Sequence, residues 1–128
     1  MALLPLNVFK TKTAVLTAGS TSRVYTAPVG VTAIVLMANA ANIDLNNTHS
    51  VTFAHYRNLP VLADTQGNGG QAGNTVTEQV LQYQIPPNDA GSLLSGKLII
   101  ESLDSIIAYS DAPGVIKLTL SILETANA

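Results

Sequence analysis

The sequence predicts an all-β protein, a single β-sandwich of the jelly-roll type with eight or nine strands and an apolar N-terminal arm. Three observations favour this class. Apolar and polar residues alternate with the period of a strand along much of the chain. Turn-forming Gly, Pro, Asn and Asp recur at intervals of roughly 8 to 12 residues, as in sandwiches. The 128 residues, 47% of them hydrophobic, suffice for one buried core.

The first half of the chain contains four expected strands. Residues 10–18 alternate regularly, and residues 23–26 form a second, shorter stretch. Residues 31–40 (VTAIVLMANA) are almost continuously apolar and β-branched at the start, which is typical of a central strand covered on both faces. Residues 50–57 alternate again. These four segments predict strands separated by polar turns.

The middle of the chain contains an edge segment, a loop and an ambiguous strand. Pro60 indicates that residues 59–63 lie at a sheet edge. Residues 64–74 (DTQGNGGQAGN) lack apolar anchors and predict a mobile loop. The centre of this loop is Gly67, Asn68, Gly69 and Gly70. Residues 75–85 also tolerate helix, but a strand is favoured because four side chains share one strand face: Thr77, Leu81, Tyr83 and Ile85.

The last third predicts three more strands. Residues 88–91 form a turn, and residues 92–95 are expected to form a brief helical turn. Strands follow over residues 97–101, 105–109 and 115–124. In the final strand, four aliphatic side chains at alternate positions are expected to point into the core: Ile116, Leu118, Leu120 and Ile122.

The chain divides into an arm with the first strand, residues 1–20, and the remainder of one sandwich, residues 21–128. The arm (MALLPLNVF) is apolar and contains a proline. It lies either along its own sandwich or across a neighbouring subunit, and its many apolar side chains favour the neighbour. The expected contact residues are Leu3, Leu4, Leu6, Val8 and Phe9.

Charge is scarce and scattered. Only 11% of the residues are charged and the net charge is −2, so a basic surface for nucleic acid is not expected. The low charge content fits a surface buried between subunits, and it equally fits the Thr and Ser usage of β-sandwiches. No apolar run is long enough to span a membrane, so a soluble protein is expected. Cysteine is absent, which excludes disulfides and thiolate metal sites.

Motifs for cofactors and metals are incomplete. The Gly-Asn-Gly-Gly-Gln-Ala run from Gly67 fits a dinucleotide loop in letters, but no helix is expected after it. Asp44, Asn46 and Thr48 are spaced as in a calcium loop, yet His49 stands where such a loop needs glycine. A turn capped by Asx side chains explains the same residues. No cofactor and no metal are expected.

Catalytic constellations are also missing. His49 and His55 have no third zinc ligand nearby in the sequence and are expected to be core or interface residues. Glu101 and Asp104 are close in sequence, but nothing in the sequence indicates that either is buried with a raised pKa. The protein is therefore not expected to be an enzyme.

Three segments carry a resemblance. They are residues 23–36 (RVYTAPVGVTAIVL), residues 86–101 (PPNDAGSLLSGKLIIE) continuing into 104–106 (DSI), and residues 118–124 (LTLSILE). Together they resemble the small β-sandwich virion structural proteins of tailed bacteriophages. In physical terms, Gly30 is expected to free the chain to enter the central strand, and Gly96 to permit a close approach before the next strand.

The resemblance implies a virion protein without a cofactor, whose partners are other virion proteins. Small size, low charge and the arm favour a capsid decoration (cement) protein that bridges capsomers, as a homo-oligomer with a trimer favoured. The alternative is a tail, neck or baseplate accessory protein, such as a fibre adaptor. A third possibility, of a different class, is a receptor- or glycan-binding module that uses the glycine-rich loop.

Overall fold

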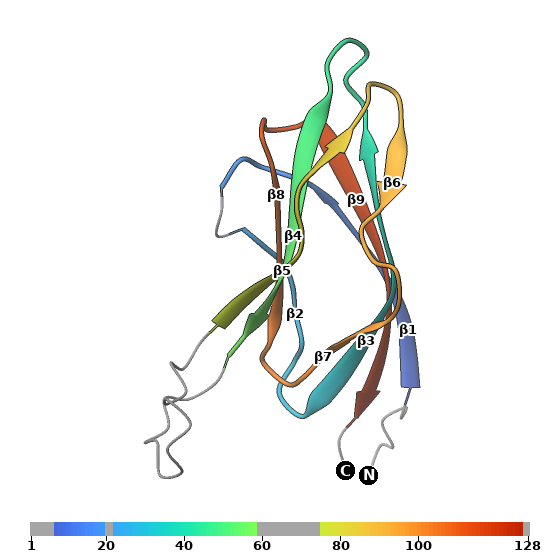
Figure 1. Cartoon of the computed structure of the whole chain (residues 1–128). Helices are drawn as coiled ribbons and strands as arrows, with labels where there is room; N and C mark the ends of the chain where they lie inside the picture. Colours follow the sequence, from blue (N-terminus) through green and yellow to red (C-terminus); the bar gives the residue numbers. More distant parts are fainter. Residues whose placement is uncertain (1–6, 20–21, 59–74, 127–128) are drawn as a thin grey trace.

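The computed structural model describes residues 7–19, 22–58 and 75–126, which form two antiparallel sheets packed face to face (Figure 1). The first sheet has the order β1-β9-β3-β6, and β7 also pairs with β3; its strands are β1 (Asn7–Val15), β3 (Val31–Asn42), β6 (Ala90–Ser92), β7 (Leu98–Ile100) and β9 (Ile116–Ala126). The second sheet has the order β2-β8-β4-β5; its strands are β2 (Arg23–Thr26), β4 (His49–Arg57), β5 (Thr75–Ile85) and β8 (Ser105–Ser110).

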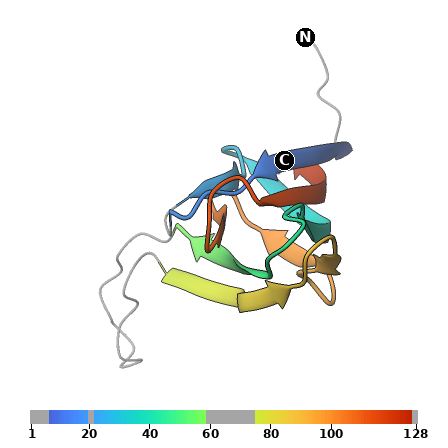
Figure 2. The same cartoon turned by 90° about the horizontal axis from the view of Figure 1, so that it is seen from above.

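The predicted β-sandwich is confirmed, and the described residues contain nine of its strands. Figure 2 shows the two sheets as separate layers when the molecule is seen from above. In the part of the chain that the structure describes, no helix could cross a membrane.

The core lies between the two layers and follows the predicted alternation of β9. Its four aliphatic side chains are buried, as expected: Ile116, Leu118, Leu120 and Ile122. Across the interface, Phe53 of β4 and Ile106 of β8 are fully buried. Each such side chain stabilises the fold by roughly 1.5–3 kcal/mol relative to exposure. This packing fixes which face of β9 points inward, and therefore which points out.

The expectation that β3 is covered on both faces is wrong. The strand is central in its sheet, between β9 and the pair β6 and β7. Ala33, Val35 and Ala38 are fully buried, whereas Leu36 and Met37 are 37% and 40% exposed. The continuous apolar run therefore reflects one face in the core and one apolar face turned to solvent.

The predicted shared face of β5 is confirmed for Thr77, Tyr83 and Ile85, which pair with one face of β4, but it is wrong for Leu81. Ile85 is buried, but Leu81 and Tyr83 are 64% and 42% exposed. The register with β4 shifts between Tyr83 and Val80, and Gln82 has a positive φ of 52°. This irregularity breaks the alternation that a regular strand would keep, so Val80 packs against the core in place of Leu81.

Several element ends differ from the expectation. The first strand begins at Asn7 and ends at Val15, because the chain then crosses to the other sheet, where Thr17 O accepts the N–H of Ser110. The expected helical turn over residues 92–95 is absent. Ser92 ends β6, and Leu93 is buried while donating its N–H to Ala38 O over 2.8 Å.

The two glycines singled out in the sequence have different outcomes. Gly30 has a φ of +75°, which confirms that its freedom is needed at the entry to β3. Gly96 does not make the expected close approach, because a Cβ added there would meet nothing within 4 Å.

Candidate functional site

A row of apolar side chains crosses the outer face of the first sheet. Phe9 of β1 is paired with Leu123 of β9, Leu123 with Ile34 of β3, and Ile34 with Ile99 of β7. Directly paired residues of antiparallel strands point to the same face. The row points away from the core, because Ile122, which adjoins Leu123 in β9, is buried and successive residues of a strand point to opposite faces.

A bulge in β3 widens this row. The pairing with β9 passes from Val35–Ile122 to Met37–Ser121, so Leu36 is an extra residue. Both Leu36 and Met37 are exposed as a result. We refer to the six side chains as the outer band: Phe9, Ile34, Leu36, Met37, Ile99 and Leu123.

The ends of the outer band are its most exposed members. Phe9 is 74% exposed and Ile99 is 57% exposed. Contiguous exposed apolar side chains on a small protein mark an interaction surface. The outer band is therefore the first candidate functional site.

The face that carries the outer band is almost without charge. Among the paired positions of β1, β9, β3, β6 and β7 on this face, Lys117 is the single charged residue. Apart from Val15, which is apolar and 56% exposed, the other positions outside the band are polar or small: Asn7, Thr11, Thr13, Thr32, Asn39, Ala41, Ala90, Ser92, Thr119, Ser121 and Thr125. A sheet face of this composition can be covered by another polypeptide without burying carboxylates.

The outer face of the second sheet is different. It carries a hollow of about 360 Å³, lined in part by the buried residues Thr52, Ala54 and Ile107. The other lining residues are Tyr56, Tyr109, Val76, Glu78 and Arg23. The Arg23 guanidinium lies 4.6 Å from the centre of the Tyr56 ring, which is a cation–π distance. Aromatic, cationic and anionic side chains thus meet on this face.

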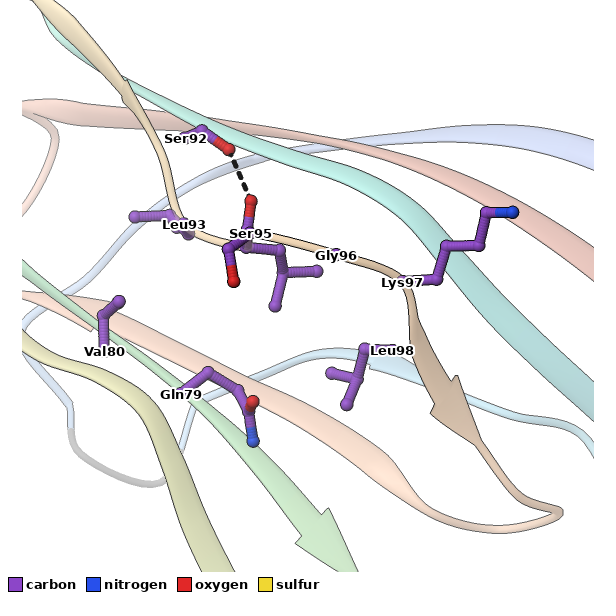
Figure 3. Close-up of a pocket in the computed structure, with 9 residues that line it drawn as sticks. Gln79, Val80, Ser92, Leu93, Ser95, Gly96, Lys97 and Leu98 are labelled. Carbon is purple, nitrogen blue, oxygen red and sulfur yellow. Dashed lines mark hydrogen bonds between the residues drawn. The ribbon is translucent and has the colours of Figure 1, made fainter.

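A larger groove of about 540 Å³ lies at the side of the sandwich, between β5 and the connection from β6 to β7 (Figure 3). Gln79 and Leu98 extend into the space between these segments, whereas the Lys97 ammonium group points away from it. Ser92 Oγ donates to Leu94 O over 2.9 Å within the connection itself. The groove has no converging set of charged groups that would bind a small ligand.

The predicted contact residues are only partly within the described chain. Phe9 lies in β1 and ends the outer band. Val8 lies in the same strand, on the opposite face, paired with Glu124. Leu3, Leu4 and Leu6 lie outside the described residues, as do the edge segment 59–63 and the loop residues Gly67, Asn68, Gly69 and Gly70. The sequence predicts Val8 and Phe9 as part of the arm, but in the structure both residues belong to β1.

The residues around Asp44 that are spaced as in a calcium loop form a turn capped by Asx side chains, the alternative interpretation of the sequence. Asp44 Oδ1 accepts the N–H of Asn46 over 2.9 Å, which is an Asx turn. His49 Nε2 lies 2.8 Å from Asp44 Oδ2, and His49 Nδ1 lies 2.8 Å from Asp111 Oδ1. The two carboxylates therefore bind different nitrogens of the ring. No group of three metal-ligating side chains is found within the described ranges.

These contacts set the protonation of the pair. Hydrogen bonds to Asp44 and then to Asp111 raise the pKa of His49 above its ordinary value of 6.5. The backbone N–H of Asn46, followed by His49, lowers the pKa of Asp44 to about 2. His49 thus ties the turn after β3 to the turn before β9, and Asp111 is a partner that sequence spacing could not indicate.

A second network surrounds Asp104, which is 1% exposed, a burial that nothing in the sequence indicated. Asn58 N–H donates to Asp104 Oδ1 over 3.0 Å, and His55 Nε2 lies 3.2 Å from Oδ2. Arg57 Nε is 3.0 Å from Oδ2, close enough for an ion pair but without the alignment of a hydrogen bond. Arg57 also meets Glu101 at 2.7 Å. The network fixes the end of β4, where the described chain stops at Asn58.

A third network links the two sheets. The Tyr25 hydroxyl of β2 donates to Glu124 Oε2 of β9 over 2.5 Å, and Lys10 Nζ lies 3.0 Å from Glu124 Oε1. Burial raises the pKa of Glu124, but the hydrogen bond from Tyr25 and the charge of Lys10 outweigh it, so the pKa is lowered overall. Burial and the contact with Glu124 raise the pKa of Tyr25. Because both carboxylate oxygens of Glu124 have partners, we interpret this cluster as a structural contact between the two sheets.

A comparison with models of known protein families finds no match to this chain, and a comparison with curated proteins finds no match either.

Proposed function

We propose that the chain is a structural protein of a tailed-bacteriophage virion, and that within the virion it is a capsid decoration (cement) protein that bridges capsomers. The observation that carries the proposal is the nearly uncharged outer face of the first sheet with its exposed apolar band. A face of this kind is suited to permanent contact with other polypeptides.

The three segments that resemble phage virion proteins support the same proposal. They contain β2, the entry to β3, the connection from β6 to β7, and most of β9. These elements build and close the sandwich. The resemblance therefore lies in the scaffold and supports the proposal by analogy, whereas the outer band supports it as a site.

The size of the contact fits an assembly of many copies. Covering the exposed parts of Phe9 and Ile99 contributes roughly 1–2 kcal/mol each, and the rest of the band adds a similar amount. The total is about 4 kcal/mol before the free-energy cost of association is subtracted. Because 4.1 kcal/mol corresponds to about millimolar affinity, a single contact of this kind binds weakly. In a closed homo-oligomer such as a trimer, each copy would contribute one such contact to its neighbour, and the joined copies would then bind the shell through avidity.

The rival placement is in the tail, neck or baseplate, as an accessory or fibre-adaptor protein. The same sheet face could serve there. The two placements differ in copy number relative to the major shell protein. Gradient-purified particles should therefore be probed for this chain by immunoblot and quantitative mass spectrometry. Copies in proportion to the shell protein support decoration, a few copies per particle support the tail or neck, and absence from the particles contradicts both.

A second candidate function is recognition of a receptor or glycan. The hollow on the second sheet favours it, because Tyr56 and Tyr109 offer aromatic surface beside Arg23 and Glu78. The test is a glycan array with the wild-type chain, with Tyr109→Ala and with residues 64–74 deleted. Binding that Tyr109→Ala abolishes assigns the hollow, and binding that only the deletion abolishes assigns the glycine-rich loop. No reproducible binding contradicts this function.

A further inference from the structure

We propose that residues 1–6 of one copy lie across the outer band of a second copy. The proposal deepens the proposed function and rests on it, because it names what covers the nearly uncharged sheet face. Residues 1–6 (MALLPL) contain three leucines and no charged side chain. They precede Asn7, two residues before Phe9, the exposed end of the band.

The direction of β1 argues against the chain's own band as the site. The strand runs from Asn7 toward Val15, and Asn7 pairs with Thr125 near the end of β9. To cover its own band, the chain would have to reverse immediately before Asn7. A four-residue reversal would take Leu4 and Leu6 into the turn, and Leu3 alone would be left to reach Phe9.

The dimensions suit an arm that continues away from its own sheet. Leu3 to Leu6 span about 10 Å when extended. The band crosses four neighbouring strands, about 14 Å at the usual spacing. Three leucines along such an arm could therefore contact aliphatic side chains from β1 to β7 of the other copy. Pro5 lacks an N–H, so one fewer backbone donor would be buried on an apolar surface.

The exposed edge of β1 does not offer a simpler contact between copies. It is the outermost strand of its sheet. Antiparallel pairing of two such strands about their centre, Thr11, would place Lys10 of each copy opposite Lys12 of the other. Like charges in direct opposition destabilise a strand pair, and lysines on an edge strand are a known protection against such pairing. The band remains as the contact surface.

The absence of cysteine from the 128 residues permits a direct test by cross-linking. Two single variants, Leu4→Cys and Ile99→Cys, are mixed, oxidised and separated without reductant. The linked peptides are then identified by mass spectrometry. The control replaces Ile99→Cys by Thr77→Cys, an exposed position in β5 of the other sheet. A docked arm raises the local thiol concentration, so we expect about tenfold more Leu4–Ile99 linkage than Leu4–Thr77 linkage.

The double variant Leu4→Cys/Ile99→Cys shows whether residues 1–6 contact the band of a second copy or the band of their own chain. If the arm crosses to a second copy, linkage joins two chains. If the arm folds back, linkage closes within one chain, which contradicts the proposal. Linkage no greater than in the Thr77→Cys control also contradicts it. Leu6→Cys repeats the test in case the change at Leu4 weakens docking, and thermal unfolding verifies that each variant folds.

The outcome can be separated from that of the proposed function. Cross-linking is measured on purified protein, whereas virion incorporation is measured on particles. Interchain linkage without incorporation would support the arm and reject the virion role. Incorporation with intrachain linkage would support the virion role and reject the exchanged arm.

Discussion

The hydroxyl of Tyr25 in β2 donates to the buried carboxylate of Glu124 in β9 over 2.5 Å, joining the two sheets of the sandwich. Lys10 in β1 binds the other oxygen of the same carboxylate. Three strands therefore converge on one side chain at the edge of the core. Removing the hydroxyl leaves a charged, largely buried oxygen without its partner.

Tyr25→Phe should lower the free energy of unfolding by about 1.5–3 kcal/mol, the usual contribution of a hydrogen bond to a charged group. Tyr83→Phe is the matched control, because Tyr83 is 42% exposed, and it should change stability by less than about 0.5 kcal/mol. Denaturant unfolding measures both. Equal effects would mean that the Tyr25 contact does not stabilise the fold.

The same pair has a pH dependence. The pKa of Glu124 is lower in the folded protein than its ordinary 4.5. Its contribution is therefore present above pH 4.5 and is lost as the pH falls through the lowered folded value. Wild-type protein should lose more stability on acidification than Tyr25→Phe does. Parallel pH profiles would contradict this assignment.

Asp104→Asn should destabilise the protein strongly, because Arg57 and His55 would lose a carboxylate that is 1% exposed. Breaking one partner of a buried ion pair costs about 3–5 kcal/mol. Glu101→Gln removes the other carboxylate of Arg57, which is 59% exposed, and should cost less than about 1 kcal/mol. Thermal unfolding of the two variants side by side checks the contrast. A mild effect of Asp104→Asn would show that the network is not coupled to the fold.

His49 should make stability depend on pH near neutrality. Its folded pKa is raised above 6.5, so its contribution is complete below 6.5 and is lost as the pH rises through the raised value. The stability difference between wild type and His49→Gln should therefore narrow as the pH rises from below 6.5 to above it. A difference that stays constant over this range would contradict the charged clamp between Asp44 and Asp111.

Gly30→Ala should cost about 1–2 kcal/mol, because a side chain is unfavourable at a φ of +75°. Gly96→Ala is the control, since Gly96 has no positive φ and open space around it, and it should be neutral or stabilising by about 0.4–1 kcal/mol. The comparison requires only denaturant unfolding. A larger loss at Gly96 than at Gly30 would contradict the backbone account.

Replacing both ends of the outer band, Phe9→Thr with Ile99→Thr, should abolish self-assembly while leaving the sandwich folded. These side chains are exposed in the isolated chain, so the unfolding temperature should change by a few degrees at most. The control is Val29→Thr with Leu45→Thr, which changes two side chains 77% and 70% exposed outside the band. Light scattering after size exclusion measures both. Assembly that survives the band variant would reject the band as the contact.

The sequence predicts the scaffold well where a strand has one buried and one exposed face. In β9, alternating aliphatic residues predict both the strand and its inward face, and these are confirmed. In β3 the same approach fails, because an apolar side chain on a solvent-facing sheet looks like a core residue in sequence. Leu36 and Met37 are exposed through a bulge that composition does not reveal.

The candidate site is predicted only at one end. Phe9 was expected to make partner contacts, but Ile99 and Leu123 join it through strand register, which sequence spacing alone does not give. Likewise, Asp104 and Asp111 lie 49 and 62 positions from the histidines they contact. Such long-range pairs depend on the topology of the fold. For the uncharged sheet face, the low overall charge is the one signal that the sequence contains.

The measurement that tests the central claim most directly is immunogold electron microscopy of intact phage particles with antibody against this chain. The decoration account predicts gold distributed over the whole head. Gold confined to the tail or neck would contradict that placement and favour the accessory role there, and particles without gold would contradict a virion role altogether.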